Sequence, residues 1–325
     1  MCRWSFEVKG ESRLKRILVT GAYGFIGRYV ARAYHAAGFY VIGIGHGTWS
    51  EREARAWGMD EWHEADVDID SLQSYAQDCE TIIHSAGSGS VGFSLMHPMK
   101  DFERTVWTTH YVLEYIRVFS PKTRFLYPSS AAVYGSQQKL PLSPDLPLHP
   151  ISPYGVHKKI VEELCAMYAR QYGVNIAVLR LFSVYGEGLK KQLLWDACCK
   201  LSRGQFDFLG TGEETRDWIH VTDVARAFLF ADEKASAGCP IFNVASGSAV
   251  KIADVLTALF QAYGASARPF FGGEVNVGNP DHYEADVETI TRWGWNPTVP
   301  LKKGIAEYVR WYRQYDDSGL HPAVQ

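Results

Sequence analysis

The stretch that decides the fold is Ile17-Leu-Val-Thr-Gly21-Ala-Tyr-Gly24-Phe-Ile-Gly27-Arg-Tyr-Val-Ala31. It begins as a short apolar run, passes three glycines and continues with helical spacing. A strand that leads through a glycine turn into a helix points backbone N–H groups and the positive helix end toward a pyrophosphate. Glycine suits this turn because a Cβ would keep phosphate from the backbone and the helix from the strand. The spacing is G-x-x-G-x-x-G and not the generic G-x-G-x-x-G, so the stretch alone fits either a dinucleotide site or a turn without a ligand.

Composition narrows the class of protein. The chain has 325 residues, of which 46% are apolar and 21% charged, as in a globular protein large enough for two unequal cores. A net charge of −3 provides no basic field for a nucleic-acid backbone, so we expect no nucleic-acid partner. No apolar run reaches the roughly 20 residues that cross a bilayer, and we expect no membrane partner. The six cysteines form no C-x-x-C pair and have no histidine at metal spacing, which predicts reduced thiols, no metal site and a cytoplasmic location.

Strand and helix patterns alternate after the glycine turn. A helix from Phe25 to Ala37 is expected to end at Gly38, and Phe39 to Ile44 reads as a strand covered on both faces. Further expected elements are a strand and helix at 62–66 and 71–76, strand 81–84, helix 101–119, strand 123–127, helix 153–172 and strand 174–181. This order predicts an α/β fold, a doubly wound parallel sheet of the Rossmann type.

Domain boundaries follow from where this regularity ends. Residues 1–13 are expected to form an N-terminal extension, and residues 14–182 the dinucleotide-binding domain. Residues 183–325 are less regular, with short strands at 206–208 and 241–243 and helices near Thr222, Ile252 and Lys302. We expect them to form mainly a smaller mixed α/β substrate lobe, with segments interleaved into the first domain. This lobe would close a cleft over the strand ends, where open α/β sheets bind ligands.

The residues after the second strand bear on the choice of dinucleotide. A carboxylate there would hydrogen-bond the adenosine ribose and repel a 2′-phosphate, favouring NAD. The sequence instead has Gly45-His46-Gly47-Thr48, with Arg52 further on, so both NAD and NADP stay open. Asp66, after the third strand, is either an adenine contact or a solvated acid beside Asp68 and Asp70.

A catalytic set is indicated by Ser129-Ser130-Ala-Ala-Val-Tyr134-Gly135 and Tyr154-Gly-Val-His-Lys158. Tyr154 and Lys158 are four residues apart and so share one face of a helix. A nearby ammonium favours the phenolate and is expected to lower the pKa of Tyr154, as a base for a sugar hydroxyl requires. Ser130 would add a hydrogen bond to the reacting oxygen. A Y-x-x-x-K pair alone is a common helical pair, but the upstream serines and the glycine turn favour the catalytic interpretation.

These motifs resemble the extended short-chain dehydrogenase/reductase family of the NAD-dependent epimerase/dehydratase type, and within it the nucleotide-sugar enzymes typified by UDP-glucose 4-epimerase. The resemblance extends from Ile17 to about Trp311. Its marks are T-G-A-Y-G-F-I-G, H-S-A-G (84–87), S-S-A-A-V-Y-G, Y-G-V-H-K, L-R-L-F-S-V-Y-G (179–186), R-D-W-I-H-V-T-D-V-A (216–225), F-N-V-A-S-G (242–247) and G-W-N-P (294–297).

The resemblance implies roles for specific positions. The catalytic residues would be Ser130, Tyr154 and Lys158. Cofactor contacts would come from Gly21, Tyr23, Gly24, Phe25, Ile26, Gly27, His46, Asp66, Val67, Ser85, Ala86, Gly87, Thr105, Tyr154, Lys158 and Leu181. Substrate contacts would come from Ser90, Ser130, Ser183, Lys191 and Arg216, with Arg216 on a substrate phosphate. A homodimer is also implied.

Departures from the family pattern concern the substrate. Ser183 and Thr105 stand where asparagines are common, and Asn276 stands where an arginine often precedes G-D-P. A phosphate clamp would then be weaker or rebuilt from Lys190, Lys191 or Arg268.

Three functions remain in view. The first is a UDP-sugar 4-epimerase that acts through a transient 4-keto intermediate with NAD. The second is an NADPH-dependent reductase of nucleotide 4-keto-6-deoxy sugars on the same residues. The third is a non-catalytic cofactor sensor, which the intact Ser-Tyr-Lys set disfavours. A 4,6-dehydratase is not expected, because Ala131 and Ala132 stand where that reaction needs an acid and a base.

Overall fold

The computed structural model describes residues 14–273 and 280–317. The expected extension at residues 1–13 and the departure at Asn276 lie outside the described residues. Within those two ranges, no helix combines the length and apolar character that a membrane crossing needs.

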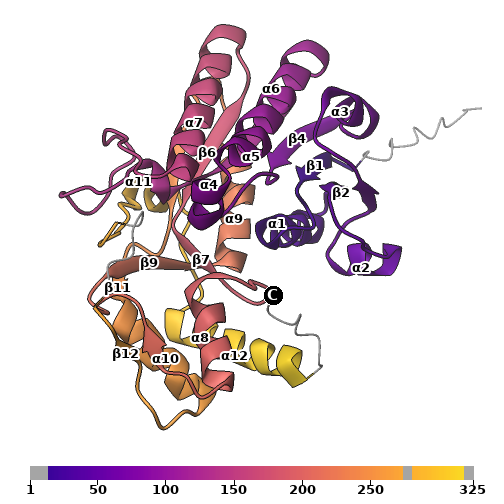
Figure 1. The fold of residues 1–325 in the computed structure, drawn as a ribbon. Coiled ribbons are helices and arrows are strands. Elements are labelled where there is room, and N and C mark those ends of the chain that lie inside the picture. The colour runs from indigo at the N-terminus through magenta and orange to yellow at the C-terminus, as the bar shows by residue number, and fades with distance from the viewer. Residues whose placement is uncertain (1–13, 274–279, 318–325) are drawn as a thin grey trace, which may run out of the picture.

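A seven-stranded parallel sheet forms the upper part of the molecule (Figure 1). Its strand order is β10-β6-β5-β4-β1-β2-β3. The strands are β1 (Arg16–Thr20), β2 (Tyr40–Gly45), β3 (Glu61–Glu64), β4 (Cys79–His84), β5 (Arg124–Ser130), β6 (Ile176–Leu181) and β10 (Ile241–Val244). The prediction of a doubly wound parallel sheet is confirmed.

Two apolar layers cover this sheet because successive strand residues face opposite sides. Ile17 and Val19 of β1 pack with α1 (Phe25–Ala36) and α9 (Val221–Asp232) on one side. Leu18 packs on the other side, with α3 (Ile69–Tyr75), α6 (Thr108–Phe119) and α7 (Pro153–Tyr172). Neighbouring residues of one strand thus hold helices on both faces.

Shorter helices connect these layers. They are α2 (Glu51–Ala56), α4 (Val91–Met96), α5 (Pro98–Phe102), the 3-10 turn η2 (Ala131–Val133) and α11 (Glu288–Arg292). The expected continuous helix 101–119 is wrong in detail. The chain forms the end of α5, a π-helical turn η1 (Glu103–Trp107) and α6. The wider turn is the kind of local distortion that often marks a functional region of a helix.

The lower part of the molecule is smaller and mixed (Figure 1). It contains a three-stranded sheet of order β11-β9-β7 and a two-stranded pair, β12 with β8. Its strands are β7 (Ser183–Tyr185), β8 (Asp207–Phe208), β9 (Thr215–His220), β11 (Ala249–Lys251) and β12 (Phe270–Phe271). Helices α8 (Gln192–Ser202), α10 (Ile252–Tyr263) and α12 (Leu301–Asp317) pack around a separate apolar core.

The chain crosses between the two parts several times. Strand β6 belongs to the large sheet, and β7 begins two residues later in the small one. Helix α9 and strand β10 then return to the large sheet. These crossings place the carboxyl ends of the large sheet against the small sheet.

Candidate active site

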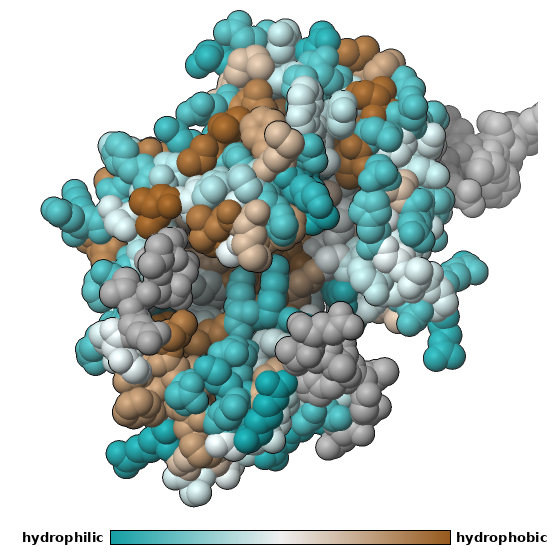
Figure 2. Space-filling model, viewed as in Figure 1, coloured by the Kyte–Doolittle hydropathy of each residue, from teal (hydrophilic) through white to brown (hydrophobic). Residues whose placement is uncertain are grey.

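A cleft of about 740 Å³ lies where the carboxyl ends of the parallel strands meet the lower part of the molecule. In Figure 2 the visible face is hollowed between the upper and lower parts. Segments from both parts line this cleft, including the glycine turn, the end of β5, the start of α7 and strand β9. This is the position at which open α/β sheets bind ligands.

The glycine turn has the geometry that the sequence predicts. Gly21 adopts the left-handed region with φ +64°, and a Cβ there would stand 2.5 Å from the backbone nitrogen of Ala86. A Cβ on Gly27 would stand 2.4 Å from the carbonyl oxygen of Gly21, so α1 can approach β1 only with glycine at this position.

The start of α1 fits an anionic group. Gly24 is the N-cap residue, offers no side-chain cap, and no acidic residue occupies the first turn. Phe25, Ile26 and Gly27 of that turn line the cleft. Their N–H groups belong to the helix end that carries partial positive charge, which suits a dinucleotide pyrophosphate.

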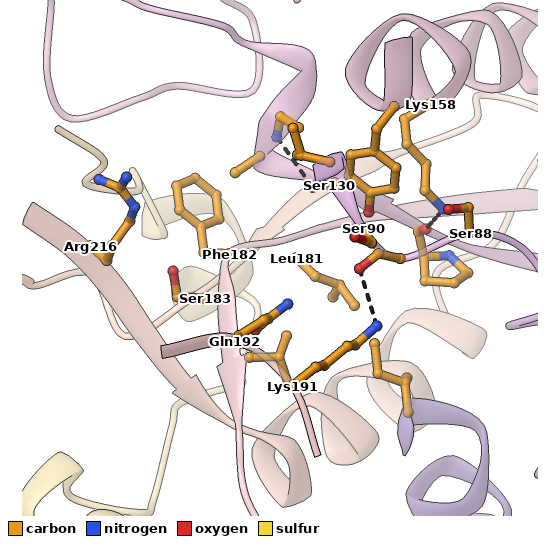
Figure 3. A pocket seen from close by; sticks show the side chains of 18 of the residues that line it. Ser88, Ser90, Ser130, Lys158, Leu181, Phe182, Ser183, Lys191, Gln192 and Arg216 are labelled. Atoms are coloured by element: carbon orange, nitrogen blue, oxygen red, sulfur yellow. Dashed lines mark hydrogen bonds between the residues drawn. The ribbon is translucent and has the colours of Figure 1, made fainter. Parts of the chain in front are cut away.

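The expected catalytic side chains lie together in the cleft. Ser130 ends β5, Tyr154 stands in the first turn of α7, and Lys158 follows one turn later. The ammonium of Lys158 is buried, donates to the carbonyl oxygen of Pro128 at 2.8 Å, and lies 5.8 Å from the centroid of the Tyr154 ring. Figure 3 shows Lys158 and Ser130 on the same side of the pocket. The spacing of four residues therefore places both groups on one helix face, as predicted.

Burial dominates the electrostatics of these groups. It lowers the pKa of Lys158 from 10.5 to about 8, although the carboxylates of Asp101 and Glu162 act to raise it. Burial also raises the pKa of Tyr154, and a hydrogen bond with Ser130 only partly offsets this effect. The expectation that Lys158 lowers the pKa of Tyr154 is therefore not met in this structure, in which the ammonium donates to Pro128. The sequence could not reveal that the phenol is partly buried.

Local caps fix the start of α7. Pro153 occupies the first turn, and the hydroxyl of Ser152 accepts from the backbone nitrogen of Gly155 at 3.2 Å. The hydroxyl of Ser94 in α4 accepts from the backbone nitrogen of Tyr154 at 3.1 Å. These contacts orient the turn that carries Tyr154.

A buried ion pair ties the same helix to the sheet. Arg180 of β6 donates from Nη2 to Glu162 of α7 at 2.7 Å, and Ser129 Oγ donates to the same carboxylate at 2.5 Å. Both charged side chains are almost completely buried. The pair holds α7 beside the ends of β5 and β6, where the cleft begins.

Arg216 lies on the opposite side of the pocket from Lys158, with Ser183 on the same side as Arg216 (Figure 3). Its Nη1 donates to the carbonyl oxygens of Thr215 at 2.8 Å and Asp281 at 3.0 Å. The guanidinium carbon stands 5.7 Å from the centroid of the Tyr283 ring. Burial lowers the pKa of Arg216, and the nearby carboxylates of Glu214 and Asp281 only partly offset this effect.

Lys191 spans the cleft. It is the N-cap residue of α8, and its Nζ donates to the carbonyl oxygen of Gly89 at 3.1 Å, as the dashed line in Figure 3 shows. Ser90, in the same loop as Gly89, caps α4 by accepting from the backbone nitrogen of Phe93 at 3.2 Å. Lys190 instead places its ammonium 3.8 Å from the ring centroid of Tyr315 in α12.

Most of the predicted site residues line this one cleft. They are Gly24, Phe25, Ile26, Gly27, Ser85, Ala86, Gly87, Ser90, Ser130, Tyr154, Lys158, Leu181, Ser183, Lys191 and Arg216.

The other predicted residues lie around it. Gly21 packs beneath Ala86, and Tyr23 contacts the ring of Trp49. His46 Nε2 and Asp66 Oδ1 form an exposed pair at 2.9 Å, and Val67 is buried in the apolar layer under α3. Thr105 is buried in the π-helical turn, where its hydroxyl accepts from the backbone nitrogen of Ser88 at 3.4 Å.

Several lining residues were not predicted from sequence. They include Ser88, Gly89, Trp218 and Tyr283. Ser88 and Gly89 directly follow the H-S-A-G strand end, so that motif could have identified them. Tyr283 is brought to the cleft by a β-bridge between Thr215 and His282. This contact joins distant segments, so no local sequence pattern predicts it.

Comparison with known proteins agrees with this geometry. The chain matches the NAD dependent epimerase/dehydratase family over residues 17–245. It is 31% identical over 313 residues to the UDP-glucose 4-epimerase of Mycolicibacterium smegmatis, covering 92% of this chain and 98% of the relative.

Two solved structures are similar in fold. One is the UDP-glucose 4-epimerase of Thermotoga maritima with UDP-glucose, with a TM-score of 0.83 and 26% identity over 92% of this chain and 99% of that one. The other is the UDP-glucuronic acid 4-epimerase of Bacillus cereus with UDP-glucuronic acid and NAD, with a TM-score of 0.82 and the same identity and coverage. Together with the glycine turn and the Ser130, Tyr154 and Lys158 set, these matches establish that the chain belongs to the NAD dependent epimerase/dehydratase family.

Proposed function

We propose that the protein is an NAD-dependent UDP-sugar 4-epimerase. The observation that carries this proposal is the convergence of Ser130, Tyr154 and Lys158 in one cleft with the start of α1. The similar proteins named above are UDP-sugar 4-epimerases, which supports the epimerase over the keto-sugar reductase.

The cofactor would be held by groups that already point into the cleft. The uncapped first turn of α1 suits the pyrophosphate, and the buried ammonium of Lys158 suits a ribose hydroxyl. The exposed His46 and Asp66 pair is available to the adenosine end. Bound NAD would supply the chemistry of accepting a hydride from the sugar C4 and returning it.

Tyr154 would act as the base and acid at the C4 hydroxyl. It would take the hydroxyl proton as the 4-keto sugar forms and return it after the sugar has turned over in the cleft. Ser130, hydrogen-bonded to Tyr154, would also contact the reacting oxygen. The charged ammonium of Lys158 would favour the phenolate once it is freed from Pro128 to face the phenol.

The substrate diphosphate would lie toward Arg216. This guanidinium lines the cleft and can bind phosphate through two N–H groups. Lys191 would contribute a second positive charge, and Ser183 and Ser90 would contact the sugar or the diphosphate. We propose that residues 14–182 serve mainly the cofactor, and residues 183–325 mainly the substrate.

We further propose that two copies of the chain associate through the segment from α4 to α6. Large apolar side chains are exposed on this segment, namely Leu95, Met96, Met99, Trp107, Val118 and Phe119. Sedimentation equilibrium should give a dimer for the wild type and a monomer for Met99→Glu; a wild-type monomer would contradict the proposal.

We also propose that the protein functions in the cytoplasm. The five free cysteines among the described residues support this location, because the cytoplasm keeps thiols reduced.

The epimerase proposal is tested by identifying the nucleotide released on denaturation and by offering UDP-glucose and UDP-glucuronate. We expect bound NAD and conversion of one of them to its C4 epimer. Tyr154→Phe should lower kcat by about 10²–10⁴-fold and leave NAD bound, because only the proton transfer is lost. Tyr172→Phe, an exposed tyrosine on the same helix, should behave as wild type. Full activity in Tyr154→Phe would overturn the assignment.

A further inference from the structure

A second buried pair lies beside the catalytic residues. His157 stands on α7 between Tyr154 and Lys158, and its Nδ1 is 2.5 Å from Oδ2 of Asp101 on α5. Asp101 is completely buried. Its second oxygen, Oδ1, has no hydrogen-bond partner among the described residues.

Packing alone does not account for a carboxylate at this position. Burying a charge costs free energy unless it is paired and fully hydrogen-bonded, and Asp101 is only half satisfied. A neutral side chain of similar shape could join α5 to α7 through His157 without that cost. The carboxylate is therefore better explained by a group on which its charge acts.

The titratable groups around Lys158 identify the group on which Asp101 acts. Those that interact with Lys158 are Tyr154, Glu162 and Cys165 on α7, Asp101 on α5, Tyr127 on β5 and His84 on β4, and His157 on α7 contacts Asp101. Of the two carboxylates, Glu162 already accepts from Arg180 through three N–H contacts. Within the described part of the chain, Asp101 forms an ion pair only with His157, which is charged only when protonated. Asp101 is thus the acid without a permanent cation of its own.

We propose that Asp101, held in place by His157, is a positioning residue whose negative charge keeps Lys158 protonated in the closed site and sets the pH range in which Tyr154 exchanges protons with the substrate. The inference rests on the proposed epimerase function. Asp101 acts to raise the pKa of Lys158 against the effect of burial, and it also raises the pKa of Tyr154. Removing its charge should lower both pKa values.

The first test is the pH dependence of kcat. Asp101→Asn keeps the shape and an oxygen that accepts from His157, but removes the charge. Both limbs of its profile should move to lower pH by about half a unit or more. Glu163→Gln removes an exposed carboxylate from the same helix and should leave the profile in place. Limbs that do not move in Asp101→Asn would overturn the proposal and indicate a packing role.

The second test needs no substrate and separates this inference from the epimerase assignment. Unfolding equilibria at pH 7 are compared for the wild type, Asp101→Asn, Lys158→Met and the double variant. If the two charges stabilise each other, Asp101→Asn should shift the equilibrium toward unfolding at least about tenfold less when Lys158 is absent, which corresponds to about 1.4 kcal/mol. Equal shifts in both backgrounds would overturn the inference even if the protein is an epimerase.

Discussion

Replacing Lys158, the proposed catalytic lysine, should make the protein more stable while it removes turnover. Burial lowers the pKa of Lys158 from 10.5 to about 8. At about 1.4 kcal/mol per pKa unit, this difference corresponds to about 3 kcal/mol that the folded protein loses at pH 7, where the lysine is charged in both states. Lys158→Met removes that cost and gives up the hydrogen bond to Pro128, which contributes about 1 kcal/mol. The net gain should be about 2 kcal/mol.

The sign of the pH dependence gives a second check on Lys158→Met. Between pH 8 and 10.5 the unfolded wild type binds more protons than the folded one, so wild-type stability rises with pH. Above pH 10.5 the lysine is neutral in both states and does not destabilise the folded protein. As the pH falls through about 8, the destabilisation by the buried charge becomes complete. The advantage of Lys158→Met should therefore shrink from about 2 kcal/mol at pH 7 to nearly zero at pH 9.5.

The assay is urea unfolding of protein stripped of nucleotide, at pH 7 and pH 9.5, followed by tryptophan fluorescence. Lys159→Met, at the neighbouring and more exposed lysine, is the matched control and should show no such pH-dependent gain. If Lys158→Met is no more stable than wild type at pH 7, or if its advantage does not change with pH, Lys158 is not a buried charge in the folded protein.

Three further substitutions test separate parts of the site. Glu162→Gln leaves Arg180 buried without its carboxylate and should lower the free energy of unfolding by about 3–5 kcal/mol, measured by urea titration. A loss below about 1 kcal/mol would contradict an ion pair that is shielded from water. Gly27→Ala places a Cβ 2.4 Å from the oxygen of Gly21 and should weaken NAD binding at least about tenfold by calorimetry, whereas unchanged affinity would place the cofactor elsewhere. Arg216→Ala should raise KM for the UDP-sugar with NAD affinity unchanged, and an equal loss of both would count against a substrate role.

The parts of the site that follow local chemistry could be predicted from sequence. The glycine turn needs glycine for steric reasons, and the Tyr154 to Lys158 spacing fixes a shared helix face wherever the helix lies. The parallel sheet followed from apolar runs that alternate with helical patterns. Each of these features is determined within a few residues of the chain.

The features that could not be predicted from the sequence depend on contacts between distant segments. The π-helical turn at η1 interrupts a region whose apolar spacing reads as one helix. Asp101 and His157 are 56 residues apart, and neither belongs to a sequence motif that predicts their contact. The raised pKa of Tyr154 likewise arises from the depth of its burial, which only the assembled elements determine.

The most direct measurement follows the hydrogen at C4 of the sugar. The UDP-sugar that the enzyme converts is prepared with deuterium at C4 and incubated with enzyme and no added dinucleotide. Because the hydride should go to bound NAD and return to the same carbon, mass spectrometry should find the epimer with its deuterium retained. Loss of the label to solvent, or product that forms only when NADPH is supplied, would contradict epimerisation through a transient 4-keto sugar.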